Sequence, residues 1–460
     1  MSAHEAGALH AEIGHAPVWL RQPADVNTLL PQLWPRTVAR GADGVLSVGG
    51  RTVRELAEEY GTPAYVLDEV DFRARCREWR DAFAGGEVHY ASKAFCCKAV
   101  VRIVAEEGLS LDVCSGGELA VALAAGMPAE RIALHGNNKS VAELTRAVEV
   151  GVGRIVVDSF DEVDRLTALA RERGVRPKVM IRVTVGVEAH THEFIATAHE
   201  DQKFGFSLAS GAAAKAAARI LHEDVLELVG LHSHIGSQIF DTSGFEISAR
   251  RVLALHAAIR DEHGVELPEL DLGGGYGIAY TSQDTPSSAA DLAAGLRKIV
   301  AEECGLRSLA VPRLSVEPGR AIVGPAVFTL YEVGTVKDVD GIRTYVSVDG
   351  GMSDNIRTAL YDAHYSATVA GRTSSAPPIL ARVVGKHCES GDIIVQDEFL
   401  PGDVQPGDLL AVPATGAYCR SMASNYNHVP RPPVLAVADG VARVIVRRET
   451  EDDLLALDVG

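Results

Sequence analysis

Eight short runs rich in β-branched residues alternate with alanine- and leucine-rich segments of helical period. The runs cover residues 88–92, 111–114, 132–135, 154–158, 178–183, 228–234, 269–273 and 313–317. This alternation predicts parallel β-α units, and eight units over about 260 residues match a (β/α)8, TIM-like barrel of the α/β class. An open doubly wound sheet remains the alternative, because periodicity cannot show whether a sheet closes.

Three strand-to-helix junctions carry an S-x-x-E pattern, in which a serine caps the helix and a glutamate reaches back to the backbone. The pairs are Ser115 with Glu118, Ser140 with Glu143, and Ser159 with Glu162. Because a capping box marks the first turn of a helix, the pattern predicts helices directly after three of the eight runs.

The sequence pattern changes after Val323, where strand-like runs are separated by Gly, Pro and Asp-Gly turns. This pattern predicts a second, all-β domain of sandwich or barrel type. The segment "GVLSVGG", which begins at Gly44, reads as a further strand that the β domain can borrow. We expect an N-terminal extension at 1–38, a strand and helix joining the β domain at 39–62, the barrel at 63–323 and the β domain at 324–460.

The chain is acidic, with 44 Lys and Arg against 62 Asp and Glu and a net charge of -18. Such a charge repels nucleic acid and anionic membrane surfaces. No apolar run reaches the roughly 18 residues that a bilayer requires, and the N-terminus lacks the features of a signal peptide. The seven cysteines form no C-x-x-C pair, so neither a disulfide framework nor a zinc ribbon is indicated. We expect a cytoplasmic protein without a nucleic-acid or membrane partner.

Polar residues gather at the carboxyl ends of the predicted strands, where the active site of a barrel lies. They are Lys93, Asp112, Ser115, His135, Asn137, Arg182, His234, the glycine loop 273–277 and the segment 317–320. A purely structural barrel would need none of these at one mouth. Glycines such as those of "DLGGGYG" allow backbone N–H groups to approach a phosphate closely.

A lysine, a stacking histidine, a phosphate cradle and an inward carboxylate together describe a site for pyridoxal 5'-phosphate. Lys93 would form the Schiff base, which requires enough desolvation to release its proton near neutral pH. Glu317 would hold the pyridine nitrogen protonated and make the ring a strong electron sink. Such a ring favours chemistry through a carbanion, including the loss of carbon dioxide.

The motifs around these residues resemble those of the diaminopimelate decarboxylases, from Gly44 to the C-terminus. This family belongs to the alanine-racemase-like group (group IV) of pyridoxal-phosphate decarboxylases, with the ornithine and arginine decarboxylases. "YASKAF" is similar to the Schiff-base motif, and "HSHIGSQ", "GGGYG" and "EPGR" to cofactor segments. The resemblance assigns Lys93 to the Schiff base, His234 to the ring face, Ser237 to the phosphate region, Gly273, Gly274 and Gly275 to the phosphate, Glu317 to the pyridine nitrogen and Arg320 to the substrate. The expected cofactor site also includes Asp112, Arg182, Pro318, Gly319 and Tyr418.

Segments of the predicted β domain extend the resemblance to the substrate. "GGMSDNIRTALY" implies that Arg357 and Tyr361 bind the distal carboxylate, and Tyr418 in "GAYC" matches a tyrosine that touches cofactor and substrate. "CESGD" implies Cys388 as the acid that reprotonates the carbanion and Glu389 as the partner of the distal amino group. In the family the last two enter the partner subunit's site, so the resemblance implies an obligate homodimer with shared active sites.

The implied reaction is decarboxylation of meso-2,6-diaminopimelate to L-lysine and carbon dioxide, the last step of lysine biosynthesis, by a carboxy-lyase. Arg320 and Arg357 agree with it, because guanidinium groups bind carboxylates bidentately and this substrate keeps one carboxylate while losing another. The expected catalytic residues are Lys93, Cys388, Glu317 and His234. The alternatives are an ornithine or arginine decarboxylase, a non-catalytic pyridoxal-phosphate-binding homologue and an amino-acid racemase.

A rival of another class is a metal-dependent hydrolase, because the pairs His190/His192 and His232/His234 have H-x-H spacing. Such a site needs further His or Asp ligands on other strand ends, and it would leave the glycine loop without a role. We therefore expect no metal. His190 and His192 fall in an expected active-site loop and have no single assignment.

Overall fold

The structure is a computed structural model that describes residues 16–186, 202–223, 225–339 and 342–460. The internal contacts divide the chain into two compact units. The barrel unit holds Arg73–Gly277 and Pro286–Ile322. The β unit holds the chain up to Phe72 together with Ile278–Thr285 and Val323–Gly460.

Eight parallel strands close into a barrel within the described part of the barrel unit, as the repeat of β-α units predicts. They are β5 (Glu87–Ala91), β6 (Ser110–Val113), β7 (Ile132–Leu134), β8 (Arg154–Val157), β9 (Lys178–Thr184), β11 (Glu227–His232), β12 (Glu269–Asp271) and β13 (Arg313–Val316). Pairing of β13 with β5 and of β8 with β9 completes the ring, and β10 (Phe206–Ser207) pairs outside it with β9. The closed ring excludes the open doubly wound sheet.

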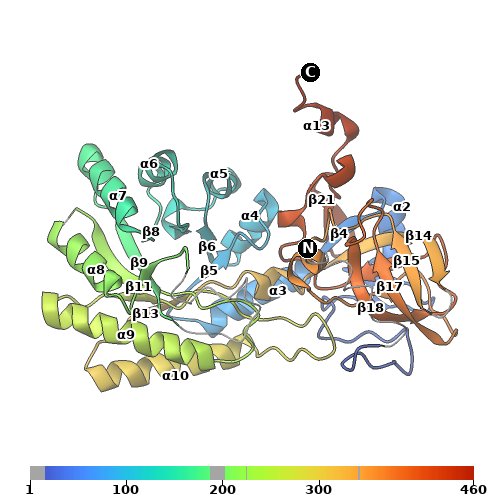
Figure 1. Cartoon of the computed structure of the whole chain (residues 1–460), viewed down its shortest axis with the longest axis horizontal. Helices are drawn as coiled ribbons and strands as arrows, with labels where there is room; N and C mark the ends of the chain where they lie inside the picture. The colour runs from blue at the N-terminus through green and yellow to red at the C-terminus, as the bar shows by residue number, and fades with distance from the viewer. Residues whose placement is uncertain (1–15, 187–201, 224, 340–341) are drawn as a thin grey trace, which may run out of the picture. The chain divides into compact units, whose positions relative to one another are not determined.

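Helices surround the strands of the barrel (Figure 1). They are α3 (Glu69–Ala82), α4 (Lys98–Glu106), α5 (Gly116–Ala125), α6 (Val141–Val150), α7 (Phe160–Arg173), α8 (Ala212–Glu223), α9 (Ser243–His263) and α10 (Ala289–Arg307), with the short α11 (Arg320–Val323) after β13. The apolar side of these helices packs on the strands, which leaves the loops at the carboxyl ends of the strands to form the barrel mouth.

The three predicted helix caps are present, but only one is a complete capping box. Ser115, Ser140 and Ser159 each accept a hydrogen bond from the N–H of the third helical residue. Of these three serines, only Ser140 also donates its backbone N–H to the glutamate carboxylate, which completes the capping box. Glu118 instead accepts from the backbone N–H of Cys114, and Glu162 accepts from the Lys139 ammonium group. The glutamates of the other two motifs therefore stabilise neighbouring backbone and side chains.

The second predicted domain is a mainly β structure. Its strands are β4 (Ala64–Asp68), β14 (Val327–Val339), β15 (Arg343–Val348), β16 (Thr368–Val369), β17 (Pro378–Val384), β18 (Ile393–Pro401), β19 (Leu409–Val412), β20 (Val434–Ala438) and β21 (Val441–Val446). The main path of the sheet runs β18-β17-β15-β14-β4-β20-β21, and β19 pairs with β14 and β16.

The strand β4 shows where the units divide. The barrel was expected to begin at residue 63, whereas β4 pairs with β14 and β20 in the sheet of the β unit. All five residues of β4 are buried. The sequence of a short and fully buried strand does not indicate which sheet the strand joins. The boundary between the two units therefore cannot be predicted from local sequence patterns.

The N-terminal segment belongs to the core of the β unit. A small sheet of β1 (Ala39–Arg40), β2 (Leu46–Val48) and β3 (Arg51–Thr52) precedes α2 (Val53–Tyr60). Leu33, Trp34 and Leu46 share one hydrophobic cluster with Phe328 and Leu330 of β14. The described part of the expected extension, residues 16–38, therefore contributes to folding of the β unit.

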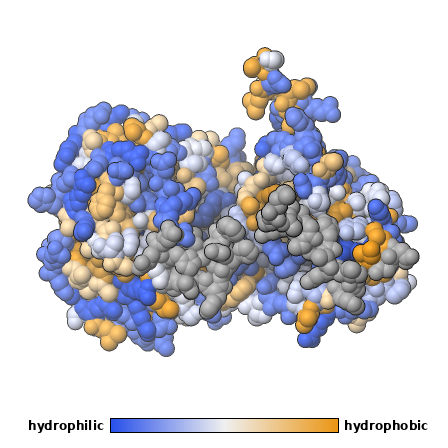
Figure 2. Space-filling model, viewed as in Figure 1, coloured by the Kyte–Doolittle hydropathy of each residue, from blue (hydrophilic) through white to orange (hydrophobic). Residues whose placement is uncertain are grey.

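The surface is largely hydrophilic on the face in view, with scattered apolar side chains (Figure 2). Exposed apolar residues include Leu455, Leu457 and Val459 in and after α13 (Glu451–Leu455), near the C-terminus. Among the described residues no helix has the length and apolar character needed to cross a bilayer.

Candidate active site

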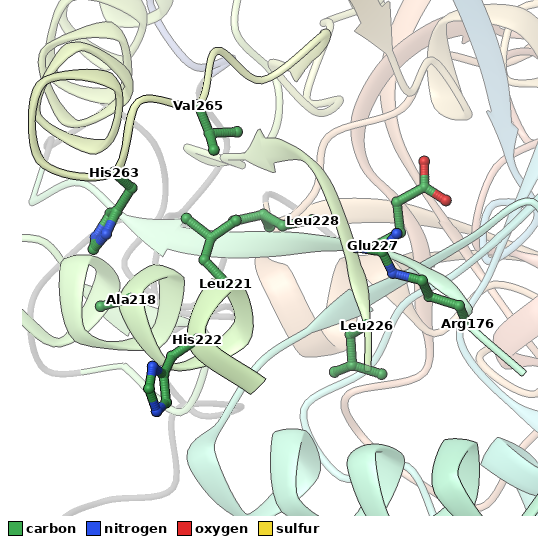
Figure 3. A pocket seen from close by; sticks show the side chains of 9 residues that line it. All are labelled: Arg176, Ala218, Leu221, His222, Leu226, Glu227, Leu228, His263 and Val265. Carbon is green, nitrogen blue, oxygen red and sulfur yellow. The ribbon is translucent and has the colours of Figure 1, made fainter. Parts of the chain in front are cut away.

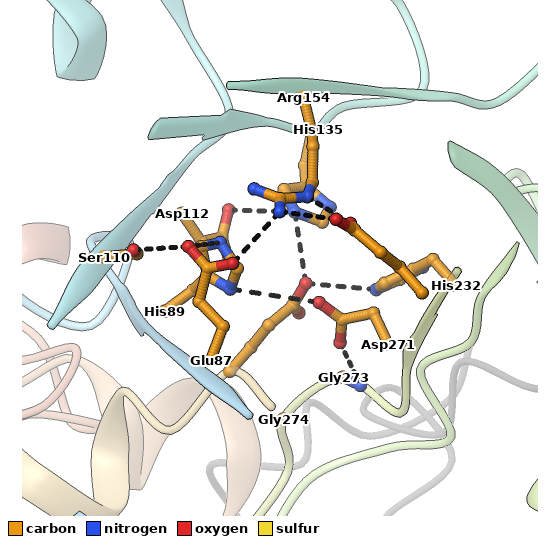
Figure 4. Close-up of polar contacts among 12 residues, drawn as sticks. Glu87, His89, Ser110, Asp112, His135, Arg154, His232, Asp271, Gly273 and Gly274 are labelled. Atoms are coloured by element: carbon orange, nitrogen blue, oxygen red, sulfur yellow. Dashed lines mark hydrogen bonds and ion pairs between the residues drawn. The ribbon is translucent and has the colours of Figure 1, made fainter. Parts of the chain in front are cut away.

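The barrel fold brings several predicted site residues to the carboxyl ends of its strands. Lys93 follows β5 and is exposed, and Asp112 lies within the last residues of β6. Glu317 follows β13 directly and is 4% exposed. Two histidines meet the Glu317 carboxylate: Oε1 lies 3.1 Å from His135 Nε2 and 3.2 Å from His232 Nε2. Figure 4 shows this cluster and the polar residues around it.

The charge on Glu317 is stabilised by its neighbours. Burial alone would raise the pKa of its carboxyl group, but His135 and His232 together hold it well below the usual range. Burial also opposes the charge on His135, yet Asp112 and Glu317 raise the pKa of that imidazole. For His232 burial prevails and lowers the pKa. The site therefore favours the charged forms of Glu317 and His135 and disfavours the charged form of His232.

The pKa of a second buried carboxyl group, that of Asp271, is shifted in the opposite direction. Burial and the negative charge of Glu317 raise the pKa of Asp271 well above its usual value. Asp271 accepts a hydrogen bond from the backbone N–H of Gly273 at 2.7 Å and lies 4.0 Å from His89. Two buried carboxyl groups with pKa values moved apart in this way are typical of functional sites.

The polar interior continues below this cluster toward the amino ends of the strands. Arg154 forms an ion pair with Glu87 at 3.1 Å (Figure 4). Arg154 also pairs with Glu269, and Arg313 contacts the same two carboxylates. The interior of a (β/α)8 barrel is commonly filled by apolar side chains. Here ion pairs occupy the lower layer, so the charges near Glu317 are embedded in a polar rather than an apolar core.

The glycine loop after β12 packs so closely that side chains are excluded. A Cβ atom on Gly274 would lie 2.3 Å from the carbonyl oxygen of Glu317, and one on Gly275 would lie 2.3 Å from that of Gly236. Gly273 and Gly275 also have positive φ values of 71° and 106°. A backbone of this kind presents N–H groups without side-chain obstruction, as a phosphate cradle requires.

The orientation of His234 is set by the same loop. Its Nδ1 accepts a hydrogen bond from the backbone N–H of Gly274 at 3.2 Å, which places the ring proton on Nε2. Burial, followed by the positive charges of Lys93 and Arg182, lowers the pKa of His234 well below its usual value. His234 is therefore a neutral ring held by the glycine loop, which suits contact with an aromatic cofactor.

Arginines lie near the other predicted cofactor residues. The Arg320 guanidinium donates a hydrogen bond to Ser237 Oγ at 2.8 Å. The Arg182 guanidinium lies 4.3 Å from the centre of the Phe204 ring, and burial lowers its pKa. Arg320 and Ser237, which the sequence motifs had assigned to substrate and phosphate, are thus direct neighbours. Pro318 and Gly319 occupy the turn between β13 and α11.

Arg357 is a buried charged residue of the β unit. It begins the short helix α12 (Arg357–Tyr361) and is only 5% exposed. Its guanidinium donates to the Tyr365 hydroxyl and lies 4.8 Å from the centre of the Tyr280 ring. No carboxylate of the described chain lies within ion-pair distance, and Nε has no hydrogen-bond partner there. A buried arginine without an anion is prepared to bind one, since burial of an unpaired charge is costly.

The remaining predicted residues of the β unit lie outside its strands. Cys388 and Glu389 are exposed, and the Glu389 carboxylate accepts a hydrogen bond from the Gly391 N–H at 3.2 Å. Tyr418 is half-buried with a left-handed φ of 65°, and Tyr361 is half-buried at the end of α12. His190 and His192 lie outside the described residues.

Sequence reasoning did not assign a role to several residues that the structure places around Glu317. His135 had been noted at a strand end without a role, His232 had been noted only for a metal site, and Asp271 and His89 had not been singled out. The available signal was strand alternation: His232 and His234 are two residues apart and Asp271 ends β12. Such positions face the barrel interior or its mouth, but only closure of the barrel shows which of them meet.

One group of side chains among the described residues has ligand atoms close enough for a metal ion. Atoms of His135, His232 and Glu317 lie within 4.8 Å of one another. His234, which completes the H-x-H pair of the rival hydrolase hypothesis, is not a member of this group, and its Nδ1 accepts from the Gly274 N–H. The group is the carboxylate cluster described above, in which His135 and His232 stabilise the charged form of Glu317.

A separate hollow lies at the amino end of β11, away from this cluster. It is lined by Arg176, Ala218, Leu221, His222, Leu226, Glu227, Leu228, His263 and Val265 (Figure 3). Glu227 begins β11 and His232 ends it, so the hollow and the cluster lie at opposite ends of one strand. Active sites of these barrels lie at the carboxyl end, so the hollow is not part of the site.

Comparison with known proteins gives one consistent result. Residues 69–324 match the family described as pyridoxal-dependent decarboxylase, pyridoxal binding domain. The chain is 60% identical over 440 residues to the diaminopimelate decarboxylase of Mycobacterium tuberculosis, which covers 94% of this chain and 98% of that protein. The enzyme of the same name from Bacillus subtilis is 47% identical over 427 residues, or 92% and 97% of the two chains. The crystal structure of diaminopimelate decarboxylase from M. jannaschii with L-lysine has a TM-score of 0.87 at 33% identity, over 93% of this chain and 99% of that one.

Proposed function

The chain belongs to the diaminopimelate decarboxylase family of pyridoxal-dependent decarboxylases, and we propose that it converts meso-2,6-diaminopimelate into L-lysine and carbon dioxide. The observation that carries the substrate assignment is Arg357, a buried guanidinium that no carboxylate of the described chain neutralises. A substrate that keeps a second carboxylate supplies the missing anion. Ornithine has none, and the alternative basic amino-acid decarboxylases are therefore disfavoured.

The cofactor is pyridoxal 5'-phosphate, and the barrel residues fit it. Glu317 is 4% exposed, and its neighbours favour the charged form of its carboxyl group, as expected for a group that would pair with a pyridinium nitrogen. Gly273, Gly274 and Gly275 suit the phosphate because their backbone leaves no room for side chains. His234 suits the ring face, and Lys93 the covalent link. When bound, the cofactor supplies an electron sink for the bond that loses carbon dioxide.

Charged side chains of the protein would orient the substrate. Arg357 binds the distal carboxylate, with Tyr361 beside it on α12, and Glu389 pairs with the distal ammonium group. Arg320 binds at the reacting end, where its bond to Ser237 also ties it to the phosphate region. Tyr418 contacts both cofactor and substrate. A guanidinium group bound at each end of the substrate would hold one carbon at the reacting position.

Cys388 would complete the reaction. Carbon dioxide leaves the carbon at the D centre, and the Cys388 thiol then delivers its proton to the same carbon. Cys388 and Glu389 are exposed in the single chain, which supports the proposal that they enter the site of a second copy in a homodimer. All seven cysteines are unpaired thiols, which supports a cytoplasmic location because that compartment keeps thiols reduced.

The test is a product assay on four substrates, meso-diaminopimelate, ornithine, arginine and lysine, with and without added pyridoxal phosphate. We expect carbon dioxide from meso-diaminopimelate alone, and release from ornithine instead would contradict the assignment. Lys93→Ala should abolish turnover, whereas Lys98→Ala, an exposed lysine at the start of α4, is the matched control and should retain it. Wild-type rates in Lys93→Ala would refute the mechanism.

A further inference from the structure

We propose that Asn427, acting through His387, is a positioning residue that holds Cys388 for proton delivery. This inference rests on the proposed function, since it concerns the acid of that reaction. It assigns a role to three residues, His387, Asn427 and Asp392, that the sequence motifs left without one. They surround the exposed loop that carries Cys388 and tie it to the buried segment that carries Arg357.

The carboxamide of Asn427 holds the Cys388 loop at two points. Its Oδ1 lies 3.3 Å from the backbone nitrogen of Cys388, which donates, and 3.1 Å from His387 Nδ1. A backbone N–H can only donate, so the oxygen of the amide must face the loop. Asn427 lies in the short 3-10 helix Tyr426–His428 and has left-handed φ and ψ values of 52° and 26°. Asn tolerates this conformation better than most residues with a Cβ atom.

The contact with Asn427 also sets the proton on His387. Because Asn427 Oδ1 accepts, Nδ1 of His387 carries the hydrogen, and Nε2 is left to accept from the Ser353 hydroxyl at 2.8 Å. His387 is 8% exposed, and its backbone N–H donates to Asp392 Oδ2 at 2.7 Å. The residue directly before Cys388 is therefore buried and fixed at its ring and its backbone, although Cys388 itself is exposed.

Asp392 connects this loop to the segment before Arg357. Its Oδ1 accepts from the Met352 N–H at 2.6 Å while Oδ2 holds His387. Backbones of the two segments also touch, because a Cβ on Gly385 would lie 2.4 Å from the Cα of Gly351. Ser353 and Met352 are five residues or fewer from Arg357 in the chain. The proposed acid and the proposed carboxylate-binding arginine are thus held in one hydrogen-bonded frame.

A frame of this kind matters because proton transfer depends steeply on distance. A thiol on an unsupported surface loop would sample many positions, and a displacement of about 1 Å can cost on the order of a hundredfold in rate. Asn427 is the side chain whose oxygen meets both Cys388 and His387, so its loss should loosen the loop without removing any group that binds substrate. The expected signature is a lower kcat with a nearly unchanged KM.

The test uses two glycine substitutions in the full-length enzyme loaded with pyridoxal phosphate. Asn427→Gly removes the carboxamide and relieves the left-handed backbone, so strain is not added. His428→Gly is the matched control: His428 also has a left-handed φ, of 55°, and is exposed. We expect kcat for meso-diaminopimelate to fall between about tenfold and a hundredfold in Asn427→Gly, with KM within about twofold, and no change in His428→Gly.

A double-mutant cycle with Cys388→Ala separates positioning from general damage. If Asn427 acts through Cys388, adding Asn427→Gly to Cys388→Ala should slow the enzyme no further. An equal additional loss in the double variant, or wild-type kcat in Asn427→Gly, would overturn the inference while leaving Cys388 as the acid. A wild-type rate in Cys388→Ala would instead refute the proposed acid. Should Asn427→Gly not fold, His387→Ala breaks the same contact from the other side and enters the same cycle.

Discussion

The buried carboxyl group of Asp354 provides a quantitative prediction about the segment that carries Arg357. Asp354 is 1% exposed and accepts hydrogen bonds from the Gly351 N–H at 2.8 Å and from the Tyr331 hydroxyl. Burial is the largest influence and raises the pKa of Asp354 from 3.8 to about 7, although both hydrogen bonds act in the other direction. The folded protein therefore holds this proton more tightly than the unfolded chain does.

The sign and size of the effect follow from proton linkage. Below pH 4 both states are protonated and the group has no effect on stability. Between pH 4 and 7 only the folded state keeps the proton, so each pH unit lowers the free energy of unfolding by about 1.4 kcal/mol. Above pH 7 both states are ionised, and the penalty levels off at about 4 kcal/mol, as an upper estimate.

The perturbation is Asp354→Asn, which is neutral at every pH and can still accept from Gly351 and donate to Tyr331. The free energy of unfolding is measured by denaturant titration at fixed protein concentration from pH 5 to pH 8. The difference between variant and wild type should shift by about 2–3 kcal/mol in favour of the variant over this range. Asp439→Asn, at an exposed turn, is the control and should show no such shift. A pH-independent difference for Asp354→Asn would refute the reasoning.

Three further predictions concern the barrel and the arginine of the β unit. Lys139→Met leaves the buried Glu162 without its ammonium partner at 2.7 Å and should lower the free energy of unfolding by about 3–5 kcal/mol, with partial recovery when Glu162→Leu is added. Tyr365→Phe removes the hydroxyl that holds Arg357, so steady-state kinetics should show KM for meso-diaminopimelate rising about tenfold with little change in kcat. Glu317→Gln removes the buried negative charge and should lower kcat by about a hundredfold. The absorbance of bound pyridoxal phosphate should show that the variant still binds the cofactor. An unchanged kcat would exclude an electrostatic role for Glu317.

Local sequence patterns were sufficient for the barrel and for the residues at its mouth. The β-α repeat, the serine caps at Ser115, Ser140 and Ser159 and the positions of Lys93 and Glu317 all depend on a few neighbouring residues. A residue at the end of a strand in a barrel must lie at the mouth, whichever strands are its neighbours. The positions of Lys93 and Glu317 at the barrel mouth could therefore be predicted before any contact was known.

Closure of the barrel, the placement of β4 and the surroundings of Glu317 depend on contacts between residues far apart in the sequence. Closure required β8 to meet β9 and β13 to meet β5, and β4 joined the β unit although its buried run reads like any other central strand. The environment of Glu317 likewise depends on packing. The two histidines that lower the pKa of its carboxyl group, His135 after β7 and His232 at the end of β11, come from different parts of the chain.

The same distinction explains the residues that local reasoning left without a role. Glu162 occupies a capping motif, yet its carboxylate pairs with Lys139, which lies 23 positions earlier in the chain. Asn427 reaches the Cys388 loop from 39 residues away. Sequence determines which chemical groups a chain carries and at which strand ends they lie. Tertiary structure alone decides which groups are buried together, because desolvation and charge pairing depend on distances in space that no local pattern contains.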